Sequence, residues 1–203
     1  MAHDLVRLTI EDIGWATSLL TEAFVDMPPC TVLFLGPNRR AQTEYFMRCT
    51  CSYAVQFGEA YASPDRTGVA LWLVPGKTTM TLGRMRKAGM LAAPFKMGVR
   101  AFLRFMAFAA HTDAMHRRSV DAPHYYLFAL GVAPGAQGRG VGRELTSRMF
   151  ERIDQGRMPA YLETQEAGNV RLYEALGFRV TGQEPFPKLE GLVNWGMLRP
   201  GGP

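Results

Sequence analysis

The sequence predicts an α/β fold in which helices flank a mixed central sheet within a single domain, residues 1–203. A continuous apolar and aromatic run at 125–132 is typical of a strand buried on both faces. An amphipathic helix follows it, with apolar residues every four positions from Val141 to Ile153. A chain of 203 residues with 47% hydrophobic content is long enough for one well-filled core.

The first part of the chain alternates between the two periodicities. The predicted elements are a strand at 5–9, a helix at 13–24, a helix at 40–55, and a hairpin of strands at 59–62 and 69–74. Asp26, Met27, Pro28 and Pro29 are expected to break the first helix, and a simple proline-terminated connection and a loop that borders a ligand pocket are equal alternatives there.

Residues 75–121 form a basic, methionine-rich insert that is helical in pattern and broken near Gly89 and Pro94. Its apolar stripe consists of Phe95, Val99, Phe102, Leu103 and Met106, and its basic row of Lys96, Arg100 and Arg104. We expect a covering helix whose basic face is solvated. An anionic membrane, nucleic acid, a wall of an acceptor site and a homodimer contact within 80–118 remain alternatives.

After the central strand at 124–132, the pattern again alternates between helix and strand. The predicted elements are a helix from 141 that ends at Gly156, a strand at 159–164, a helix at 169–176 with Gly177 in the terminating position, and strands at 178–182 and 192–198.

A glycine-rich turn joins the central strand to the following helix. Gly138, Gly140 and Gly142 alternate with other residues, so the backbone can turn tightly and approach a ligand. The unpaired N–H groups and the positive end of the helix dipole favour phosphate, and Arg139 and Arg143 add charge.

Two known phosphate loops do not fit this turn. A Walker-type loop would place Lys and Ser/Thr at Val141 and Gly142. A dinucleotide fingerprint that starts at Gly138 and Gly140 would need a third glycine at Arg143.

The turn instead resembles the acetyl-CoA loop of the GCN5-related N-acetyltransferase (GNAT) superfamily, whose motif is matched by Gln137, Gly140 and Gly142. Downstream, 161–164 (Tyr-Leu-Glu-Thr) and 169–178 look like the puromycin N-acetyltransferase branch. The resemblance covers about 124–182 and implies the acyl-CoA N-acyltransferase fold, with acetyl-CoA in a gap between strands 124–132 and 160–164.

The resemblance also implies a set of acetyl-CoA-binding residues and no metal. These residues are Leu130, Val132, Gln137, Gly138, Arg139, Gly140, Val141, Gly142, Arg143, Asn169 and Tyr173. Tyr173 lies one helical turn after Asn169 and is the candidate acid for the departing thiolate. The alternative for Tyr173 is a tyrosine that only packs in the core, and the alternative for Asn169 is a helix N-cap.

Glu163 is the candidate base, because it follows apolar residues at a strand end where desolvation increases basicity. A surface or hydrogen-bonded Glu is an equal alternative. His124 is a second candidate base, and Asp26 and Glu166 have only their loop positions in their favour. The resemblance adds Phe24, Asp26 and Met27 as candidates to line the acceptor pocket.

The resemblance implies an N-acetyltransferase that moves an acetyl group directly from acetyl-CoA to a primary amine of a small molecule, with antibiotics and amine metabolites as candidates. Alternatives are a protein lysine or N-terminal acetyltransferase and a non-catalytic CoA-binding module; a nicotinamide dehydrogenase is a distant fourth. A net charge of +5 suits an anionic ligand or surface.

Composition limits the other classes of protein. Three cysteines and four histidines at these spacings make neither a disulfide framework nor a zinc site. No apolar run is long enough for a membrane span, and no basic-then-apolar leader begins the chain. We therefore expect a cytoplasmic protein that does not span a membrane and does not bind nucleic acid.

Overall fold

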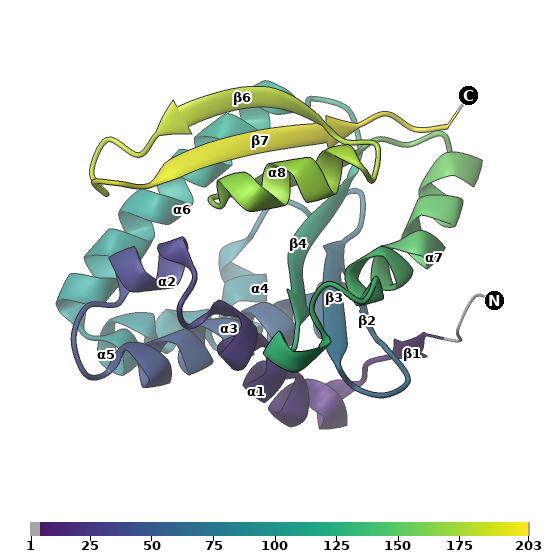
Figure 1. The fold of residues 1–203 in the computed structure, drawn as a ribbon. Coiled ribbons are helices and arrows are strands. Elements are labelled where there is room, and N and C mark those ends of the chain that lie inside the picture. The colour runs from purple at the N-terminus through teal and green to yellow at the C-terminus, as the bar shows by residue number, and fades with distance from the viewer. Residues whose placement is uncertain (1–4, 203) are drawn as a thin grey trace.

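A computed structural model describes residues 5–202. Within them, seven strands form one sheet (Figure 1). The strands are β1 (Val6–Arg7), β2 (Gly58–Ala62), β3 (Gly68–Leu73), β4 (Tyr125–Val132), β5 (Ala160–Thr164), β6 (Arg179–Pro185) and β7 (Val193–Arg199). Their order is β1-β2-β3-β4-β5-β7-β6, and β4 and β5 are parallel whereas the other neighbours are antiparallel. The mixed sheet flanked by helices confirms the predicted fold class.

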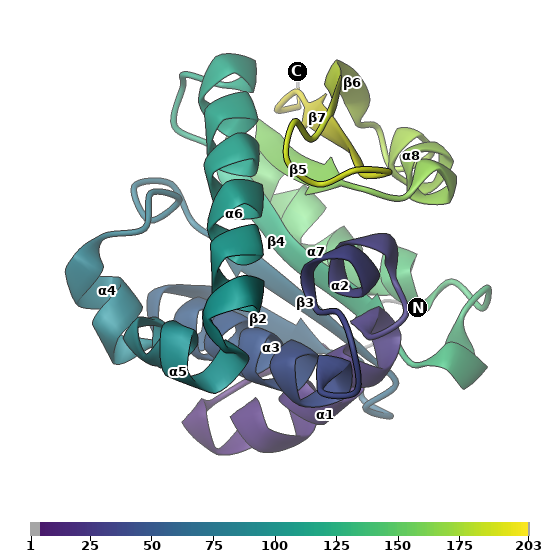
Figure 2. The ribbon, with the colours of Figure 1, turned by 90° about the vertical axis from the view of Figure 1, so that its left-hand side faces the viewer.

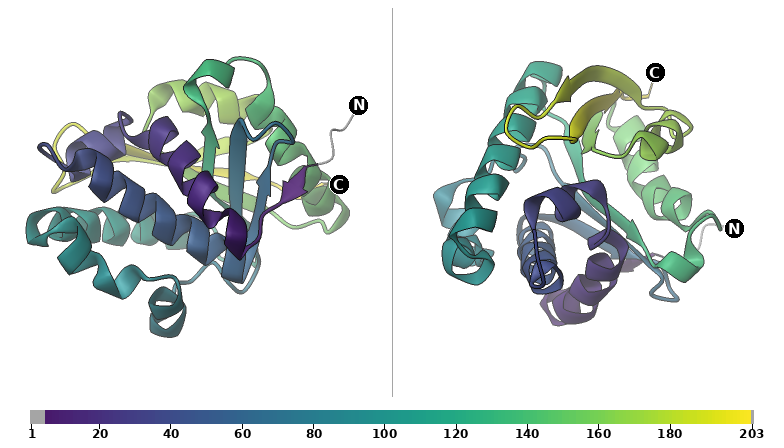
Figure 3. Two further views of the ribbon diagram at one scale, coloured as in Figure 1. Left: turned by 90° about the horizontal axis from the view of Figure 1, so that it is seen from below. Right: turned by 60° about the vertical axis from the view of Figure 1, so that its left-hand side comes forward.

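Helices cover both faces of this sheet. They are α1 (Ile13–Phe24), α2 (Pro28–Leu33), α3 (Arg39–Phe57), α4 (Leu82–Lys87), α5 (Ala93–Met97), α6 (Val99–Ser119), α7 (Val141–Gln155) and α8 (Ala167–Glu174). One core lies beneath α1, α3 and the insert helices, and a second lies beneath α7 and α8. Figure 2 shows α6 running across the front of the sheet with α7 behind it, and Figure 3 shows α1 and α3 side by side.

Prolines lie in the first turns of two helices, α2 and α5, and the insert is broken near Gly89 and Pro94 as expected. Pro28 and Pro29 lie in the first turn of α2, a helix that we did not predict, because a missing N–H costs nothing there. In the insert, Pro94 likewise lies in the first turn of α5. The break before α6 is at Gly98, whose φ of +80° favours glycine.

The insert covers the core, but its apolar stripe is divided between two faces. Phe102 packs against the core with Ala101 and Met97. Phe95 and Leu103, by contrast, are 90% and 61% exposed. The basic side chains of Lys96 and Arg100 are solvated as expected, and part of the apolar stripe is exposed with them. No helix among residues 5–202 is both long and apolar enough to cross a membrane.

Gly68 allows α7 to lie close to the sheet. A Cβ at this position would be 2.6 Å from Leu145 Cδ1 and 2.7 Å from Val141 Cγ1, both in α7. Leu145 is fully buried, so a shift of its side chain would disturb the surrounding core. Because Gly68 has no side chain, the first turn of α7 can pack closely against β3. The glycine-rich loop ends at this turn.

We expect Gly68→Ala to lower the free energy of unfolding by about 1–3 kcal/mol, because the added methyl overpacks this contact. Gly14→Ala is the matched control, since Gly14 lies in α1 with nothing within 4 Å of an added Cβ. The control should be neutral or stabilised by up to about 1 kcal/mol. Urea denaturation measures both, and equal stabilities for the two variants would contradict this account of α7.

Candidate active site

The two parallel strands of the sheet pair over a short distance only. Among the described residues, β4 and β5 are in register at Tyr125–Ala160 and Tyr126–Tyr161 and nowhere further along. Beyond this point β4 continues to Val132 with β3 on its other side. Its backbone groups that face away from β3 are therefore left without a strand partner, which opens a site for an extended ligand.

A β-bulge changes which side chains of β4 face each core. Leu71 pairs with Ala129 whereas Trp72 pairs with Leu127, so Phe128 is the extra residue. As a result Phe128 and Ala129 both face the α1 and α3 side, and Leu130 then faces α7. The bulge thus reverses which face of the sheet each side chain of β4 takes, at the start of the stretch that has no β5 partner.

The glycine-rich loop has the backbone conformation that its sequence requires. Gly138 and Gly140 have φ values of +75° and +85°, and no heavy atom lies within 4 Å of a Cβ added to either. Gln137 donates from Nε2 to the carbonyl of Val132, at 3.2 Å, and so ties the loop to the end of β4. The exposed side chains of Arg139 and Arg143 flank the start of α7. Open space, positive charge and a helix N-terminus therefore coincide here.

Tyr173 lies on α8 and is buried, with 8% of its surface exposed. Its ring packs edge-on against Phe178 at 6.0 Å. Burial raises the pKa of Tyr173 to about 12, so the phenol is protonated at neutral pH. The N-cap of α8 is Glu166, whose side chain accepts from the Gly168 N–H at 3.5 Å. Asn169 is therefore not the N-cap, and its half-buried side chain remains available for another role.

Glu163 lies near the end of β5, on the sheet face opposite Tyr173. The hydroxyl of Tyr126 donates to Glu163 Oε2 at 2.6 Å. The other oxygen, Oε1, is buried and has no hydrogen-bond partner within the described residues. Burial raises the pKa of Glu163 to about 8, although the Tyr126 hydrogen bond opposes the shift. This side chain is therefore a desolvated carboxyl, as a general base requires.

An aromatic and histidine cluster supports this carboxyl. The His116 ring stacks on Tyr161, with centroids 4.5 Å apart and planes 11° apart. The Tyr161 hydroxyl is buried without a hydrogen-bond partner in residues 5–202. His116 Nε2 lies 2.7 Å from His124 Nε2, and His124 Nδ1 lies 2.7 Å from the Ala122 carbonyl. Burial lowers the pKa of both histidines, that of His116 to about 4, so both are neutral at pH 7.

The predicted acceptor-lining residues lie in different environments. Both ring nitrogens of His124 are engaged, which favours a structural role over that of a base. Asp26 is 3.2 Å from Arg39, its side chain is 82% exposed, and it is a solvated surface partner. Phe24 packs over β4, near Gly131. Met27 is the half-buried N-cap of α2.

Sequence reasoning did not single out Tyr126 and His116 as part of the site. Tyr126 pairs with Tyr161 on the neighbouring strand, and Glu163 lies two residues after Tyr161, so the three side chains share one face of the sheet. The alternation of side chains along a strand could therefore have predicted that Tyr126 lies near Glu163. His116 comes from the distant α6, and no sequence pattern connects it to β5.

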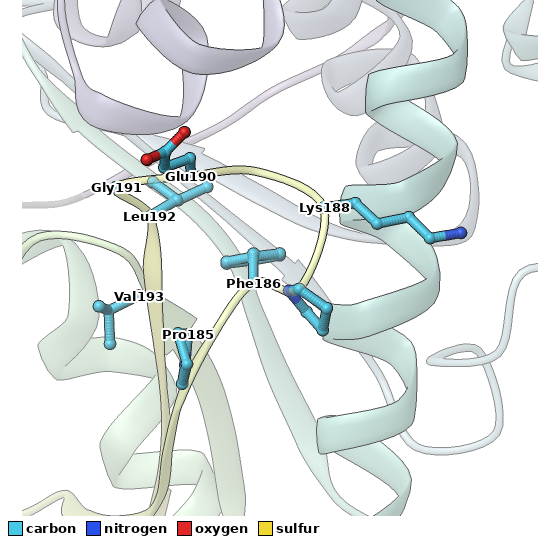
Figure 4. Close-up of a pocket in the computed structure, with 8 residues that line it drawn as sticks. Pro185, Phe186, Lys188, Glu190, Gly191, Leu192 and Val193 are labelled. Carbon is cyan, nitrogen blue, oxygen red and sulfur yellow. The ribbon is translucent and has the colours of Figure 1, made fainter.

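The loop between β6 and β7 forms a further wall next to α6. Phe186 stacks on Phe108 of α6, with centroids 5.1 Å apart and planes 7° apart. A pocket of about 620 Å³ is lined by the loop (Figure 4). Its lining residues are Pro185, Phe186, Pro187, Lys188, Glu190, Gly191, Leu192 and Val193. None of the predicted catalytic residues, Glu163 and Tyr173, is among them.

Comparison with known proteins identifies the family. A family model described as the acetyltransferase (GNAT) family matches residues 99–178. An uncharacterized N-acetyltransferase of Schizosaccharomyces pombe is 28% identical over 180 residues, which cover 85% of this chain and 72% of that protein. An L-methionine sulfoximine/L-methionine sulfone acetyltransferase of Salmonella typhimurium is 40% identical over 72 residues, which cover 34% of this chain and 42% of that protein.

Solved structures agree at the level of the fold. A histone acetyltransferase HPA2 and related acetyltransferase from Corynebacterium glutamicum has a TM-score of 0.67 at 22% identity, and covers 100% of this chain and 99% of that one. A mosquito arylalkylamine N-acetyltransferase like 5b has a TM-score of 0.60 at 18% identity, over 97% and 98% of the two chains. The matched sequence segments, the shared fold and the glycine loop lead to one conclusion: the chain is an acetyltransferase enzyme of the GNAT superfamily.

Proposed function

We propose that this enzyme transfers the acetyl group of acetyl-CoA directly to the primary amine of a small molecule. The observation that carries the proposal is Glu163, a buried carboxyl with a pKa near 8 and one unpartnered oxygen beside the β4–β5 gap. A cytoplasmic location and the puromycin-like branch, with its link to antibiotic resistance, stay predictions.

Acetyl-CoA fits the open features of residues 124–182. The backbone of β4 near Leu130 and Val132 would pair with the pantetheine arm, and the amides from Gly138 to Arg143 would hold the pyrophosphate. The open space above Gly138 and Gly140 supports this assignment. Asn169 is half-buried and is not the N-cap of α8, so its side chain would be free to contact the same ligand.

Glu163 would take the proton of the attacking amine, directly or through one water. An alkyl amine has a pKa of about 10.4 and arrives mainly as ammonium, which an ionised carboxylate attracts. Because Tyr126 occupies Oε2, we assign proton transfer to Oε1. The uncharged histidines behind Tyr161 would not compete for this proton.

Tyr173 would stabilise the departing thiolate on the other face of the sheet. A thiol has a pKa of about 8.5, so full proton transfer from a phenol of pKa about 12 is uphill by about 5 kcal/mol. A hydrogen bond donated by the phenol as negative charge develops on sulfur costs much less. We therefore assign Tyr173 the role of hydrogen-bond donor, with the proton following as the product leaves.

A small acceptor is favoured over a protein because α6 and the β6–β7 loop lie over this side of the sheet. α6 packs against α2, β5, β6 and β7, and Phe108 fixes the loop to it. An extended polypeptide would need an open groove here. Screening a panel of small primary amines that includes puromycin, with lysine peptides as the comparison, tests this choice; turnover of the peptides alone would reverse it.

We expect Gly140→Ala to weaken acetyl-CoA binding at least ten-fold, because a Cβ would enter the space that a phosphate needs and the left-handed conformation would become strained. Gly76→Ala is the matched control, since Gly76 has a φ of +78° and equally open surroundings in another loop. Calorimetry with acetyl-CoA measures both. If both variants bind like the parent protein, the loop is only a turn.

We expect Glu163→Gln to lower the rate of acetyl transfer by about 10²–10⁴-fold while leaving acetyl-CoA affinity unchanged. The parent enzyme should gain activity with rising pH up to about 8, because only the ionised carboxylate accepts a proton. The variant should lose this inflection in kcat/KM. Glu166→Gln, which alters the N-cap of α8, should keep it. An unchanged pH profile in Glu163→Gln would assign the base elsewhere.

We expect Tyr173→Phe to lower the single-turnover rate by about a hundred-fold, since the donor to the thiolate is removed and the ring packing is kept. Tyr45→Phe is the control: its hydroxyl donates to the Gly89 carbonyl at 2.6 Å, within the α3 and insert region. Rapid-quench measurement with saturating acetyl-CoA compares them. Equal rates for the two variants would leave Tyr173 as a packing residue.

A further inference from the structure

The insert carries an apolar surface that the chemistry above does not use. Its exposed large side chains lie on η2 (Met90–Ala92), α5 and α6, three consecutive helices of which each contacts the next, and we call them the apolar ridge: Leu91, Phe95, Val99, Leu103 and Met106. Phe95 is 90% exposed and Val99 66% exposed. Figure 2 shows α6 in front of the sheet and α5 at the lower end of α6, where it packs against α3 and α6. Such a row of exposed apolar side chains marks an interaction surface.

The segment that carries this ridge is basic and has no acidic residue of its own. Between Lys77 and Thr112 the chain has seven Lys or Arg and no Asp or Glu. The exposed basic side chains nearest the ridge are Arg86, Lys87, Lys96 and Arg100. Within residues 5–202, none of them forms a salt bridge. The other 16 Lys or Arg face 18 Asp or Glu, so the positive charge of the chain is concentrated here.

The combination of ridge and charge selects among possible partners. A second copy joined through a two-fold axis would bring the same basic side chains together, and their repulsion opposes that contact. Nucleic acid would pair with the basic side chains but would leave Phe95 and Val99 in water. An anionic lipid surface satisfies both features, because the acyl boundary takes apolar side chains and the phosphates take Lys and Arg.

We propose that residues 82–106 dock on an anionic lipid surface. The apolar ridge enters the boundary between headgroups and acyl chains, and the basic side chains contact lipid phosphates. The glycine loop belongs to the opposite face of the sheet, with α7, so docking leaves it free. The proposal is independent of the acetyl-transfer assignment, since no ridge residue belongs to the β4–β5 gap.

The test is sedimentation of the full chain with vesicles of phosphatidylcholine alone or with about one-third phosphatidylserine. We expect binding to the anionic vesicles only, weakening as salt rises. Lys96→Gln with Arg100→Gln should weaken it about thirty-fold, at about 1 kcal/mol per basic side chain. Phe95→Ser with Leu103→Ser should weaken it at least ten-fold. Ile10→Ser is the control, because Ile10 is also apolar and 70% exposed but lies beside α1.

Circular dichroism and thermal unfolding establish that each variant is folded, because these side chains are exposed and their replacement should not disturb the core. Absence of binding to anionic vesicles at low salt would overturn the proposal, as would binding that the ridge and charge variants leave unchanged. A dimer that Phe95→Ser with Leu103→Ser converts to a monomer, measured by light scattering, would assign the ridge to a second copy. Duplex DNA binding as tight as vesicle binding would assign the charge to nucleic acid.

Discussion

The early end of pairing between β4 and β5 is the constraint on which the rest of the site depends. Backbone N–H and C=O groups removed from water need partners, and a strand in the middle of a sheet normally finds them on both sides. Beyond Tyr126, β4 has β3 on one side only. The side chain of Gln137 donates a hydrogen bond to the carbonyl of Val132 and so satisfies one of these groups. The remaining groups are available to an extended ligand, and the glycine loop begins where this open stretch ends.

The gap also brings together the two faces of the sheet. Glu163 lies with Tyr126 and Tyr161 on the face covered by α6, whereas Tyr173 belongs to the core beneath α7 and α8. A group that takes a proton from an incoming amine and a group that stabilises a departing thiolate need to act on opposite sides of the reacting carbonyl. A closed sheet would separate these two groups. In the proposed reaction, the opening between the strands would let one small reacting group reach both, as direct transfer without a covalent enzyme intermediate requires.

The sequence predicted best where local physics decides the structure. The buried run of β4, the amphipathic α7 and the loop with Gly138 and Gly140 follow from periodicity and backbone freedom, and the structure has them where expected. The apolar residues from Ile13 to Phe24, whose spacing predicted a helix, lie in α1. The first helix ends before Pro28 as predicted, but α2 was missed because a proline pair can also begin a helix, and the pair alone does not show this.

Long-range contacts are the part that sequence could not supply. His116 meets Tyr161 only because α6 crosses the sheet. The apolar stripe of the insert was visible in the sequence, but helical spacing does not state which part of a wide stripe faces the core. Phe102 faces inward and Leu103, one residue later, faces outward. Asp26 was a candidate by loop position, and the nearby Arg39 holds it at the surface.

The environment of Glu163 has two opposing effects: it makes the carboxylate a stronger base, and it lowers the fraction of the carboxyl that is ionised at pH 7. An ordinary carboxylate of pKa 4.5 is about six pKa units weaker as a base than an alkyl amine of pKa about 10.4. Burial to a pKa of about 8 narrows this difference by about 5 kcal/mol. The same shift leaves only about a tenth of the carboxyl ionised at pH 7, which costs about 1.4 kcal/mol. The gain of about 5 kcal/mol in basicity exceeds the cost of about 1.4 kcal/mol for ionisation. A buried carboxyl is therefore a better base here at neutral pH than an exposed one when at least about a third of that gain is expressed in the transition state.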